Sequence, residues 1–278
     1  MEITIEHTTN YEYSKPIKGL IQTTKLHPSE HDGLKIIKWK VDNYATEKSK
    51  IYQDAENNNI QNFTNKNVVK NIKFKVKGRV ETFDTKGIYY SKADKLDPLV
   101  YLRNTQLTNY DDNIKELANE AVSKTSNDDL ETAHNLLRLV AERVEYKPLT
   151  TSQETSAIVA YKQKKGVCQD QAHIMIAAAR SIGIPARYIN GYMHNNSHSS
   201  EYQSTHAWAE FYIANLGWVG FDSTNNCSPD ERYIRVSCGL DANYAAPIKG
   251  VFYGNSNQNN SIENLDIYVQ TLEYNSQQ

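Results

Sequence analysis

One cysteine in this sequence has the surroundings of a nucleophile. Cys168 comes directly after the break at Gly166-Val167 and opens a mostly apolar run from Ile174 to Ile182. This pattern predicts a buried helix with the thiol in its first turn. The unpaired backbone N–H groups and the positive end of the helix dipole both favour thiolate over thiol at that position. Cys168 is therefore our candidate for a nucleophile that attacks a carbonyl carbon.

A thiolate needs a base, and the base needs a group that orients it. The stretches around His206 and Asp222 each alternate apolar with polar residues, and a short connection joins them, so they predict an antiparallel hairpin. If a three-residue loop pairs Ile213 with Gly217, the apolar side chains of both strands share one face. His206 and Asp222 then lie on the other face as diagonal neighbours within reach of each other. A two-residue loop would reverse this parity, so the pairing of the two residues depends on the register.

Together these residues predict a catalytic triad in the chain order Cys168, His206, Asp222. His206 would accept the thiol proton and hold it as an imidazolium, while Asp222 fixes the imidazole tautomer and supports the positive charge. The backbone N–H of Cys168 would donate to the developing oxyanion. Candidates for further oxyanion or substrate contacts are Tyr146, Gln163 and Trp208.

The other cysteines and the residues of the predicted helix have simpler interpretations. Cys227 and Cys238 show no partner pattern and are expected to be inert. His173 lies about 140° around the helix from Cys168, so the two would not share a metal ion. Asp170 is expected to favour the helix dipole or to make a structural hydrogen bond.

Nothing in the sequence marks a metal or cofactor site. His194 and His198 lie in a polar stretch and are expected to be solvated, and Glu210 is expected to be an exposed strand residue. The sequence contains no glycine-rich phosphate loop and no cluster of metal ligands. We therefore expect neither a metal ion nor a cofactor.

Length and composition indicate a globular protein of one large domain or two ordinary ones. The chain has 278 residues, of which 39% are hydrophobic and 23% charged, and its formal net charge is −2. A net charge this close to zero does not predict a nucleic-acid partner. The stretch from Met1 to His7 does not resemble a signal peptide, and no apolar run has the roughly 18 residues of a membrane span. With three cysteines and no disulfide framework, we expect a cytoplasmic location and no membrane partner, and we leave the oligomeric state open.

The elements that must position the triad fall into two parts. Residues 1–105 alternate with the period of strands and predict a β-sandwich-like accessory domain. From about residue 110 the spacing becomes helical, and strands return after Pro185. We expect residues 106–278 to form a catalytic domain with C-terminal strands, which makes the chain an α+β protein.

Several separated blocks of this sequence resemble the bacterial transglutaminase-like superfamily. The core blocks are Gly166-Val167-Cys168-Gln169-Asp170, Gly183-Ile184-Pro185-Ala186-Arg187, His206-Ala207-Trp208-Ala209-Glu210 and Gly217-Trp218-Val219-Gly220-Phe221-Asp222. His7-Thr8-Thr9, with Tyr11 and Tyr13, is similar to the start of that family's β-rich N-terminal region. The resemblance implies a papain/transglutaminase-like core, with helices packed on an antiparallel sheet, and a triad at Cys168, His206 and Asp222. Ser223 departs from the proline that the family often has after the aspartate.

The resemblance does not decide the reaction, because the superfamily includes proteases, other amide hydrolases and amide-forming transferases. We expect a cysteine-dependent amide or peptide bond hydrolase, a transglutaminase-like cysteine protease or amidase. It would form a thioacyl intermediate with a peptide or protein substrate, and water is the default second nucleophile because no residue marks an amine site. The alternatives are a protein-glutamine acyltransferase, a true transglutaminase, and a non-catalytic peptide-binding member of the same fold. We expect the pocket to be lined by loops such as 194–204 and by the N-terminal domain.

Overall fold

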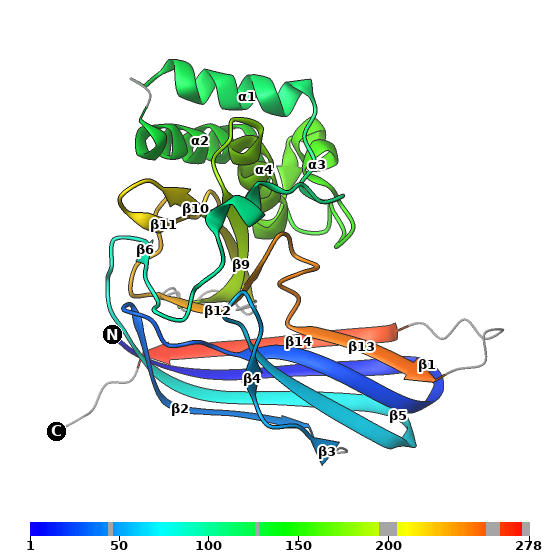
Figure 1. Cartoon of the computed structure of the whole chain (residues 1–278). Helices are drawn as coiled ribbons and strands as arrows, with labels where there is room; N and C mark the ends of the chain where they lie inside the picture. Colours follow the sequence, from blue (N-terminus) through cyan, green and yellow to red (C-terminus); the bar gives the residue numbers. More distant parts are fainter. Residues whose placement is uncertain (44–46, 126–127, 195–204, 254–261, 274–278) are drawn as a thin grey trace.

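Two antiparallel sheets, a short parallel strand pair and a group of helices make up the structure, a computed structural model (Figure 1). It describes residues 1–43, 47–125, 128–194, 205–253 and 262–273. The predicted α+β fold class, with helices packed on an antiparallel sheet, is confirmed. No helix in these described ranges is long and apolar enough to cross a membrane.

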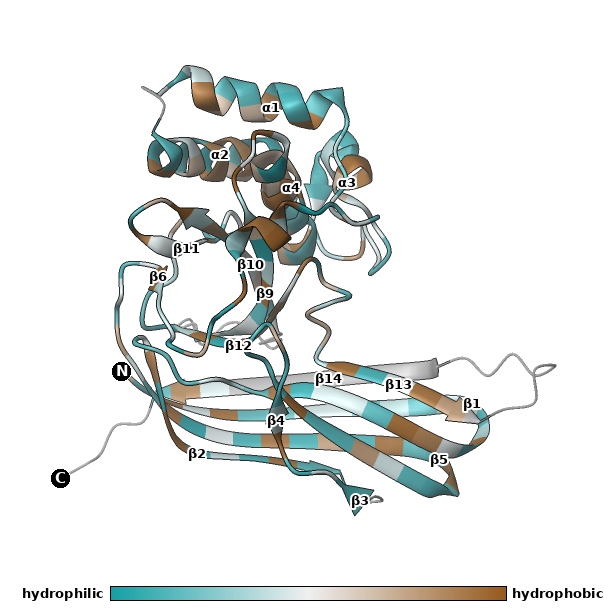
Figure 2. Cartoon of the chain, in the orientation of Figure 1, coloured by the Kyte–Doolittle hydropathy of each residue, from teal (hydrophilic) through white to brown (hydrophobic). Residues whose placement is uncertain are grey.

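The first sheet is built on two long strands, β1 (Glu2–His27) and β5 (Asn59–Thr82), which pair with each other along most of their length. β5 also pairs with β2 (Leu34–Asn43), β3 (Glu47–Lys48) and β4 (Tyr52–Gln53). Buried residues alternate with less buried ones along much of β1 and β5. Figure 2 shows a matching alternation of hydrophobic and hydrophilic residues along these strands. One face of the sheet is therefore packed, as a period of two predicts.

The first sheet encloses a core of its own. Its central pairing slips between Glu12 and Ile17, next to Pro16, which has no N–H to donate to a neighbouring strand. Buried side chains from both sides of this irregularity, among them Tyr13, Leu20 and Phe74, pack into one hydrophobic cluster. The β-rich N-terminal part that the sequence predicts thus has a hydrophobic core of its own.

The two C-terminal strands complete the first sheet. β13 (Ile248–Tyr253) pairs with the second half of β1, and β14 (Ile262–Glu273) pairs with its first half. These strands, which the sequence analysis grouped with residues 106–278, thus pair with the first sheet. A 26-residue strand such as β1 leaves a long row of backbone donors and acceptors at a free edge, and β13 and β14 satisfy them. Alternation within a strand carries no information about which distant edge the strand will join.

The second sheet contains the predicted hairpin. Its strand order is β12 (Tyr233–Gly239), β9 (Ala186–Met193), β10 (His206–Ile213), β11 (Gly217–Phe221) and β6 (Ile88–Tyr89). The edge strand β6 precedes all the helices in the chain, so residues 1–105 also contribute a strand to this sheet. A separate short pair, β7 (Glu145–Tyr146) with β8 (Lys165–Gly166), is parallel.

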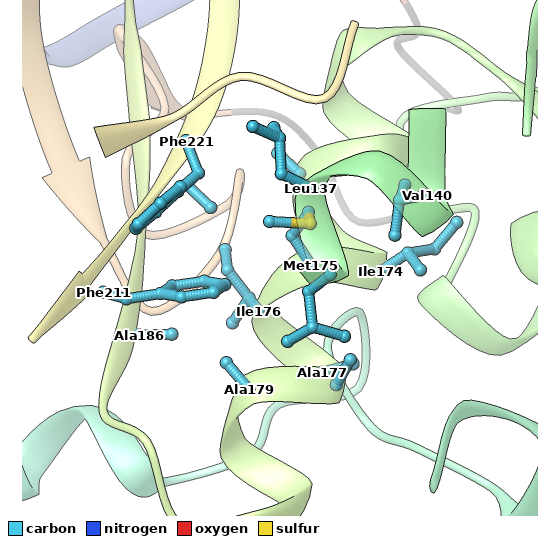
Figure 3. Close-up of a cluster of buried hydrophobic side chains, with 14 of the residues drawn as sticks. Leu137, Val140, Ile174, Met175, Ile176, Ala177, Ala179, Ala186, Phe211 and Phe221 are labelled. Atoms are coloured by element: carbon cyan, nitrogen blue, oxygen red, sulfur yellow. The ribbon is translucent and has the colours of Figure 1, made fainter. Parts of the chain in front are cut away.

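The helices cover the second sheet. They are the 3₁₀ helix η1 (Pro98–Leu102), α1 (Asp112–Ser123), α2 (Asp129–Arg143), α3 (Ala157–Gln163) and α4 (Cys168–Ser181). α4 packs against the other α-helices and against β9 and β10, and it is buried on nearly every side (Figures 1 and 3). Its Met175 and Ile176 pack in one cluster with Leu137 of α2 and with Phe211 and Phe221 of the hairpin. A helix that is apolar on nearly every side folds as the centre of a core, and α4 does so here.

A hydrophobic contact joins the two sheets. Ile3 and Ile5 of β1 pack with Tyr192 of β9 and Ile234 of β12. Farther along β1, His7 Nδ1 lies 2.8 Å from the Tyr192 hydroxyl. Burial lowers the pKa of His7 to about 4, so its imidazole is neutral at pH 7. One strand of the first sheet thus runs along the second sheet and is fixed to it.

Candidate active site

The start of α4 places the candidate nucleophile. Cys168 is the first residue of the helix and is partly exposed, as the sequence predicts. The buried Asp170 carboxylate turns back on this helix start, where its Oδ2 accepts from Val167 N at 2.8 Å and from Thr151 Oγ1 at 2.6 Å. A β-carbon at Gly166 would lie 2.6 Å from Asp170 Cβ, so the close approach of the two backbone segments requires glycine. Asp170 makes the structural hydrogen bonds that were expected of it.

The hairpin has the predicted register. Ile213 pairs with Gly217 and Ala209 with Phe221. The apolar side chains of one face all enter the core beneath α4, and they are Ala207, Ala209, Phe211, Ile213, Val219 and Phe221. His206 and Asp222 come together, with His206 Nε2 lying 2.7 Å from Asp222 Oδ2.

His206 connects the carboxylate to the thiol. It is 9% exposed and Asp222 is 1% exposed, and the ring also makes a side-chain hydrogen bond with Cys168. Burial alone would lower the pKa of His206, but the hydrogen bonds to Asp222 and Cys168 and the Asp222 charge raise it to about 10. The imidazole in turn holds the pKa of Asp222 below its usual value despite burial. Because Nε2 serves the carboxylate, Nδ1 is left for the thiol. We call Cys168, His206 and Asp222 the thiol corner.

Two residues that the sequence did not single out hold the Asp222 carboxylate. The Tyr233 hydroxyl and Asn225 Nδ2 each donate to Asp222 Oδ2 at 2.7 Å. The backbone N–H of Thr224 donates to Oδ1 at 3.0 Å. Asn225 could have been found, because an Asp followed by Ser, Thr and Asn is typical of an Asx turn. Tyr233 is the first residue of β12, which pairs with β9 and not with the hairpin. Its position in the sequence therefore gives no signal of a contact with Asp222.

The three predicted oxyanion or substrate contacts lie in different surroundings. Tyr146, on β7, is exposed, and it is close enough to Cys168 for a thiolate there to raise its pKa further than burial alone does. Gln163 is exposed at the end of α3 and does not line the cavity beside the thiol. Trp208 is buried and stacks on the His206 ring, with 6.2 Å between ring centroids. Trp208 therefore supports the imidazole from behind rather than facing a substrate.

A cavity of about 310 Å³ opens beside the thiol corner. Cys168 and His206 lie on its wall, together with Gln153, Gln169 and Tyr188. None of these last three residues was predicted to line a substrate pocket. Of the loop 194–204 that was expected to line a pocket, residues 195–204 lie outside the described part of the chain, as does His198.

Glu210 is not the exposed strand residue that the sequence suggests. It is 2% exposed, and its carboxylate accepts from Arg187 Nε at 2.7 Å and from Arg235 Nε at 2.8 Å. Arg187 Nη1 also pairs with Asp94 Oδ2 at 2.7 Å. Arg187 of β9 and Arg235 of β12 lie against Glu210 within the same sheet, and alternation within one hairpin cannot reveal such partners. We call Arg187, Arg235, Glu210 and Asp94 the arginine cluster.

The remaining histidines and cysteines are placed as follows. His173 is fully buried and its Nε2 accepts from Ala242 N at 3.1 Å, so it fixes a loop and does not face Cys168. His194, expected to be solvated, is 5% exposed and its Nδ1 lies 3.0 Å from Thr271 Oγ1. Cys227 and Cys238 are free thiols, and burial raises the pKa of both. Among the described residues no group of three or more His, Cys, Asp or Glu could hold a metal ion.

Two family models match the chain. The model of the transglutaminase-like superfamily matches residues 115–223, a segment that contains the whole thiol corner. The model of the bacterial transglutaminase-like N-terminal region matches residues 3–81, which form most of the first sheet. Both matches agree with the resemblance seen in the sequence blocks.

Individual relatives match over parts of their length. An uncharacterised protein of Mycobacterium leprae is 36% identical over 121 residues, 42% of this chain and 43% of that protein, so the chain spans less than half of that relative. A protein-glutamine gamma-glutamyltransferase of Pseudomonas aeruginosa is 25% identical over 56% of this chain and 25% of that enzyme. The crystal structure of a candidate cysteine protease from Cytophaga hutchinsonii superposes with a TM-score of 0.73 at 20% identity, over 99% of this chain and 92% of that one. That superposition shows a shared fold along the whole chain.

Proposed function

This chain belongs to the transglutaminase-like superfamily, and from that premise we propose that it is a cysteine-dependent enzyme that hydrolyses amide or peptide bonds through a thioacyl intermediate. One observation carries the proposal. The buried His206 ring lies between the Asp222 carboxylate and the Cys168 thiol, and it does so at the wall of a cavity. A base that is oriented on one side and bonded to a thiol on the other is the arrangement that nucleophilic catalysis requires.

The proposed acylation step uses the residues of the thiol corner. The Cys168 sulfur attacks the carbonyl carbon of the amide, and the oxyanion that forms accepts a hydrogen bond from the backbone N–H of Cys168. The His206 imidazolium then gives its proton to the leaving nitrogen, the C–N bond breaks, and an amine departs. Asp222 supports the positive ring before this transfer and keeps the tautomer fixed after it. The exposed Tyr146 is the proposed second oxyanion donor, because it lies near Cys168.

Deacylation reverses these roles. His206, now neutral, takes a proton from water as the water attacks the thioester carbonyl, and the C–S bond breaks. The products are a carboxylic acid and the regenerated thiolate beside an imidazolium. Over both steps, one amide and one water molecule give one amine and one carboxylic acid.

A second candidate function is acyl transfer to an amine, in which an amine replaces water in this step. The observation that favours it is the relation to the Pseudomonas aeruginosa protein-glutamine gamma-glutamyltransferase, although the match covers only 25% of that enzyme. The two candidates share the thioacyl intermediate and differ only in what releases it.

A single screen tests the proposal and separates the candidates. A library of peptides and amides is incubated with the enzyme with and without a primary amine, and intact mass is recorded for both enzyme and products. We expect an acyl adduct on Cys168 and a carboxylic acid product. Products joined to the amine would replace hydrolysis by acyl transfer. A protein that binds peptides but forms no adduct at Cys168 would instead be a binding module of this fold.

We also propose a cytoplasmic location. The support is chemical, because Cys168, Cys227 and Cys238 are all free thiols and a reducing compartment keeps thiols in that form. Fractionation of the source cells, with detection of the protein in each fraction, tests this proposal.

A further inference from the structure

The cavity beside the thiol corner is not formed by the second sheet alone. Tyr11, on β1 of the first sheet, is part of its wall. So are Pro247 and Ile248, at the point where the chain passes from the second sheet into β13. Tyr11 of the N-terminal region and the start of β13 therefore face the same space as Cys168 and His206.

The strand alternation explains how Tyr11 reaches this place. On β1, His7 and Tyr11 lie on one face, four residues or about 13 Å apart. On β9, Tyr192 and Tyr188 also share one face at the same spacing. His7 is hydrogen-bonded to Tyr192, and Tyr11 and Tyr188 both line the cavity. β1 and β9 are thus joined by the contact of His7 with Tyr192, and they flank the cavity with Tyr11 and Tyr188.

Tyr11 is fixed in position from behind. It is partly buried against the core of the first sheet and pairs with Ile72 of β5 and Leu265 of β14. Burial, followed by the nearby Tyr13, raises the pKa of Tyr11 to about 12, so the phenol is neutral at pH 7. A neutral aromatic ring on a rigid strand is suited to packing against a ligand group.

The segment between the two sheets forms the adjoining wall and is fixed at both ends. Ala242 N donates to the His173 ring of α4 at 3.1 Å, and Lys25 N of β1 donates to Pro247 O at 2.8 Å. In between, Ser237 Oγ donates to Ala245 O at 2.7 Å. Figure 1 shows this segment, in orange, running from the second sheet to the first. The wall is therefore held to α4 and β12 at one end and to β1 at the other.

The described residues of the cavity lining are uncharged apart from the His206 ring. Among the described residues around it there is no Lys, Arg, Asp or Glu. The polar groups there are carboxamides, hydroxyls and the thiol, and the rest are small apolar residues and two tyrosines. A charged substrate group would lose water there without gaining a partner.

Building on the proposed function, we propose that Tyr11 and Ile248 form a specificity wall that binds an uncharged, bulky substrate group next to the carbonyl attacked by Cys168. The N-terminal region is then a substrate-selecting part of the enzyme. Its substrates carry an aromatic or large aliphatic group at this position, and a charged group of the same size is rejected. Tyr11 acts on the substrate and has no part in the proton transfers.

Alkylating probes test the wall without knowledge of the natural substrate. Rates of modification at Cys168 are measured by mass spectrometry with iodoacetamide, with N-benzyl iodoacetamide, and with the iodoacetyl derivatives of norleucine amide and lysine amide. In the unaltered protein we expect the norleucine probe to react about tenfold faster than the charged lysine probe. The ratio of the benzyl rate to the iodoacetamide rate should fall about tenfold in Tyr11→Ala, the range for a lost aromatic contact.

Further variants keep the test decisive if Tyr11→Ala folds poorly. Tyr11→Phe keeps the ring and should keep the ratio, whereas Ile248→Ala should lower it about threefold. Tyr52→Ala removes an exposed tyrosine from β4 of the same sheet and should leave the ratio unchanged. If the ratio of the benzyl rate to the iodoacetamide rate stays within twofold of the wild-type value in both Tyr11→Ala and Ile248→Ala, the proposed specificity wall is wrong.

The same measurement separates the wall from the proposed function. If iodoacetamide modifies Cys168 no faster than Cys227, but the ratio still falls in Tyr11→Ala, the wall exists and the catalytic proposal fails. If Cys168 reacts fast and the ratios do not move, the catalytic proposal stands and the wall is wrong.

Discussion

Two buried polar clusters lie on the outer face of the same hairpin, and they compensate buried charge in different ways. In the arginine cluster every charge meets an opposite charge, and the side chains of Arg187 and Glu210 are 0% and 3% exposed. In the thiol corner one end, Asp222, is equally buried and fully hydrogen-bonded, but the other end is a partly exposed thiol at a cavity. The first cluster is closed and the second is open at one end.

The comparison shows which property distinguishes a reactive cluster from a structural one. Buried partners shift pKa values in both clusters, since Glu210 has a lowered pKa beside its arginines and His206 a raised one beside Asp222. A shifted pKa therefore does not separate them. Access of a nucleophile to a cavity does. Variants in the thiol corner should therefore impair turnover, and variants in the arginine cluster should impair stability.

The largest expected effect is at the open end of the thiol corner. Cys168→Ala should reduce turnover to background, because no other group can form the thioacyl intermediate. The free energy of unfolding should change little, since the thiol is partly exposed and makes one side-chain hydrogen bond. Turnover assays and urea melts measure the two quantities, with Cys227→Ala as the matched control. Wild-type turnover in Cys168→Ala would refute the mechanism.

At the buried end of the same corner, Asp222→Asn should slow turnover by about 1,000- to 10,000-fold. Asp222 Oδ2 accepts from His206, Tyr233 and Asn225, and an amide cannot serve all these donors and also support an imidazolium. Single-turnover kinetics with the peptide found in the library screen gives the rate. A loss below tenfold would mean that His206 does not need its carboxylate.

In the closed cluster, Glu210→Ala should lower the free energy of unfolding by about 3–5 kcal/mol, because it leaves Arg187 and Arg235 buried without their shared carboxylate. Urea denaturation measures the change. Glu47→Ala breaks an exposed ion pair with Lys66 and should cost less than about 1 kcal/mol. The folded fraction of the Glu210 variant should keep its turnover, and a turnover loss as large as in Asp222→Asn would end the distinction between the clusters.

The titration of His206 tests how Asp222 acts on the ring in the thiol corner. With a raised pKa, the folded state favours the protonated ring, so its contribution to stability is complete below about pH 6.5 and is lost as the pH rises through about 10. NMR titration of labelled histidine rings, assigned with His206→Gln, should show a midpoint near 10. In Asp222→Asn the midpoint should move down towards 6.5. An unchanged midpoint would remove Asp222 as a cause of the shift.

The smallest effect is expected at Tyr233, whose hydroxyl is one of several donors to Asp222. Tyr233→Phe should slow turnover about fivefold, the value of one hydrogen bond of about 1 kcal/mol. The control is Tyr212→Phe, which alters an exposed tyrosine of β10 and should leave turnover unchanged. Steady-state kinetics compares the two. Equal rates in both variants would show that the remaining donors suffice to hold the carboxylate.

Local pattern predicted the hairpin and the position of Cys168 at its helix start. The register of the hairpin is predictable because the apolar residues of both strands must share one face. The pairing of Ile213 with Gly217 follows from that condition. The break at Gly166 and the apolar run after it placed the helix start in the same way. Both inferences used residues close together in the chain.

What the sequence did not predict depends on contacts between distant segments. Glu210 is buried against Arg187 of β9 and Arg235 of β12, and Asp94 in turn pairs with Arg187. The tyrosines at positions 233 and 188 reach the thiol corner through sheet pairings that no local period encodes. Register and burial of such residues follow from the order of strands in the sheet, and that order is a property of the whole fold.

The pairing of β1 with β13 and β14 also has a consequence for how the protein is made. β1 comes from the beginning of this sequence, and its partners at that edge come from residues beyond 248. During synthesis that edge has no partner until the second sheet and its helices have left the ribosome. Nascent chains that contain β1 but not yet β13 and β14 are therefore exposed to edge-to-edge aggregation. Closing the sheet is then a late, long-range step, which predicts slow folding for a chain of this size.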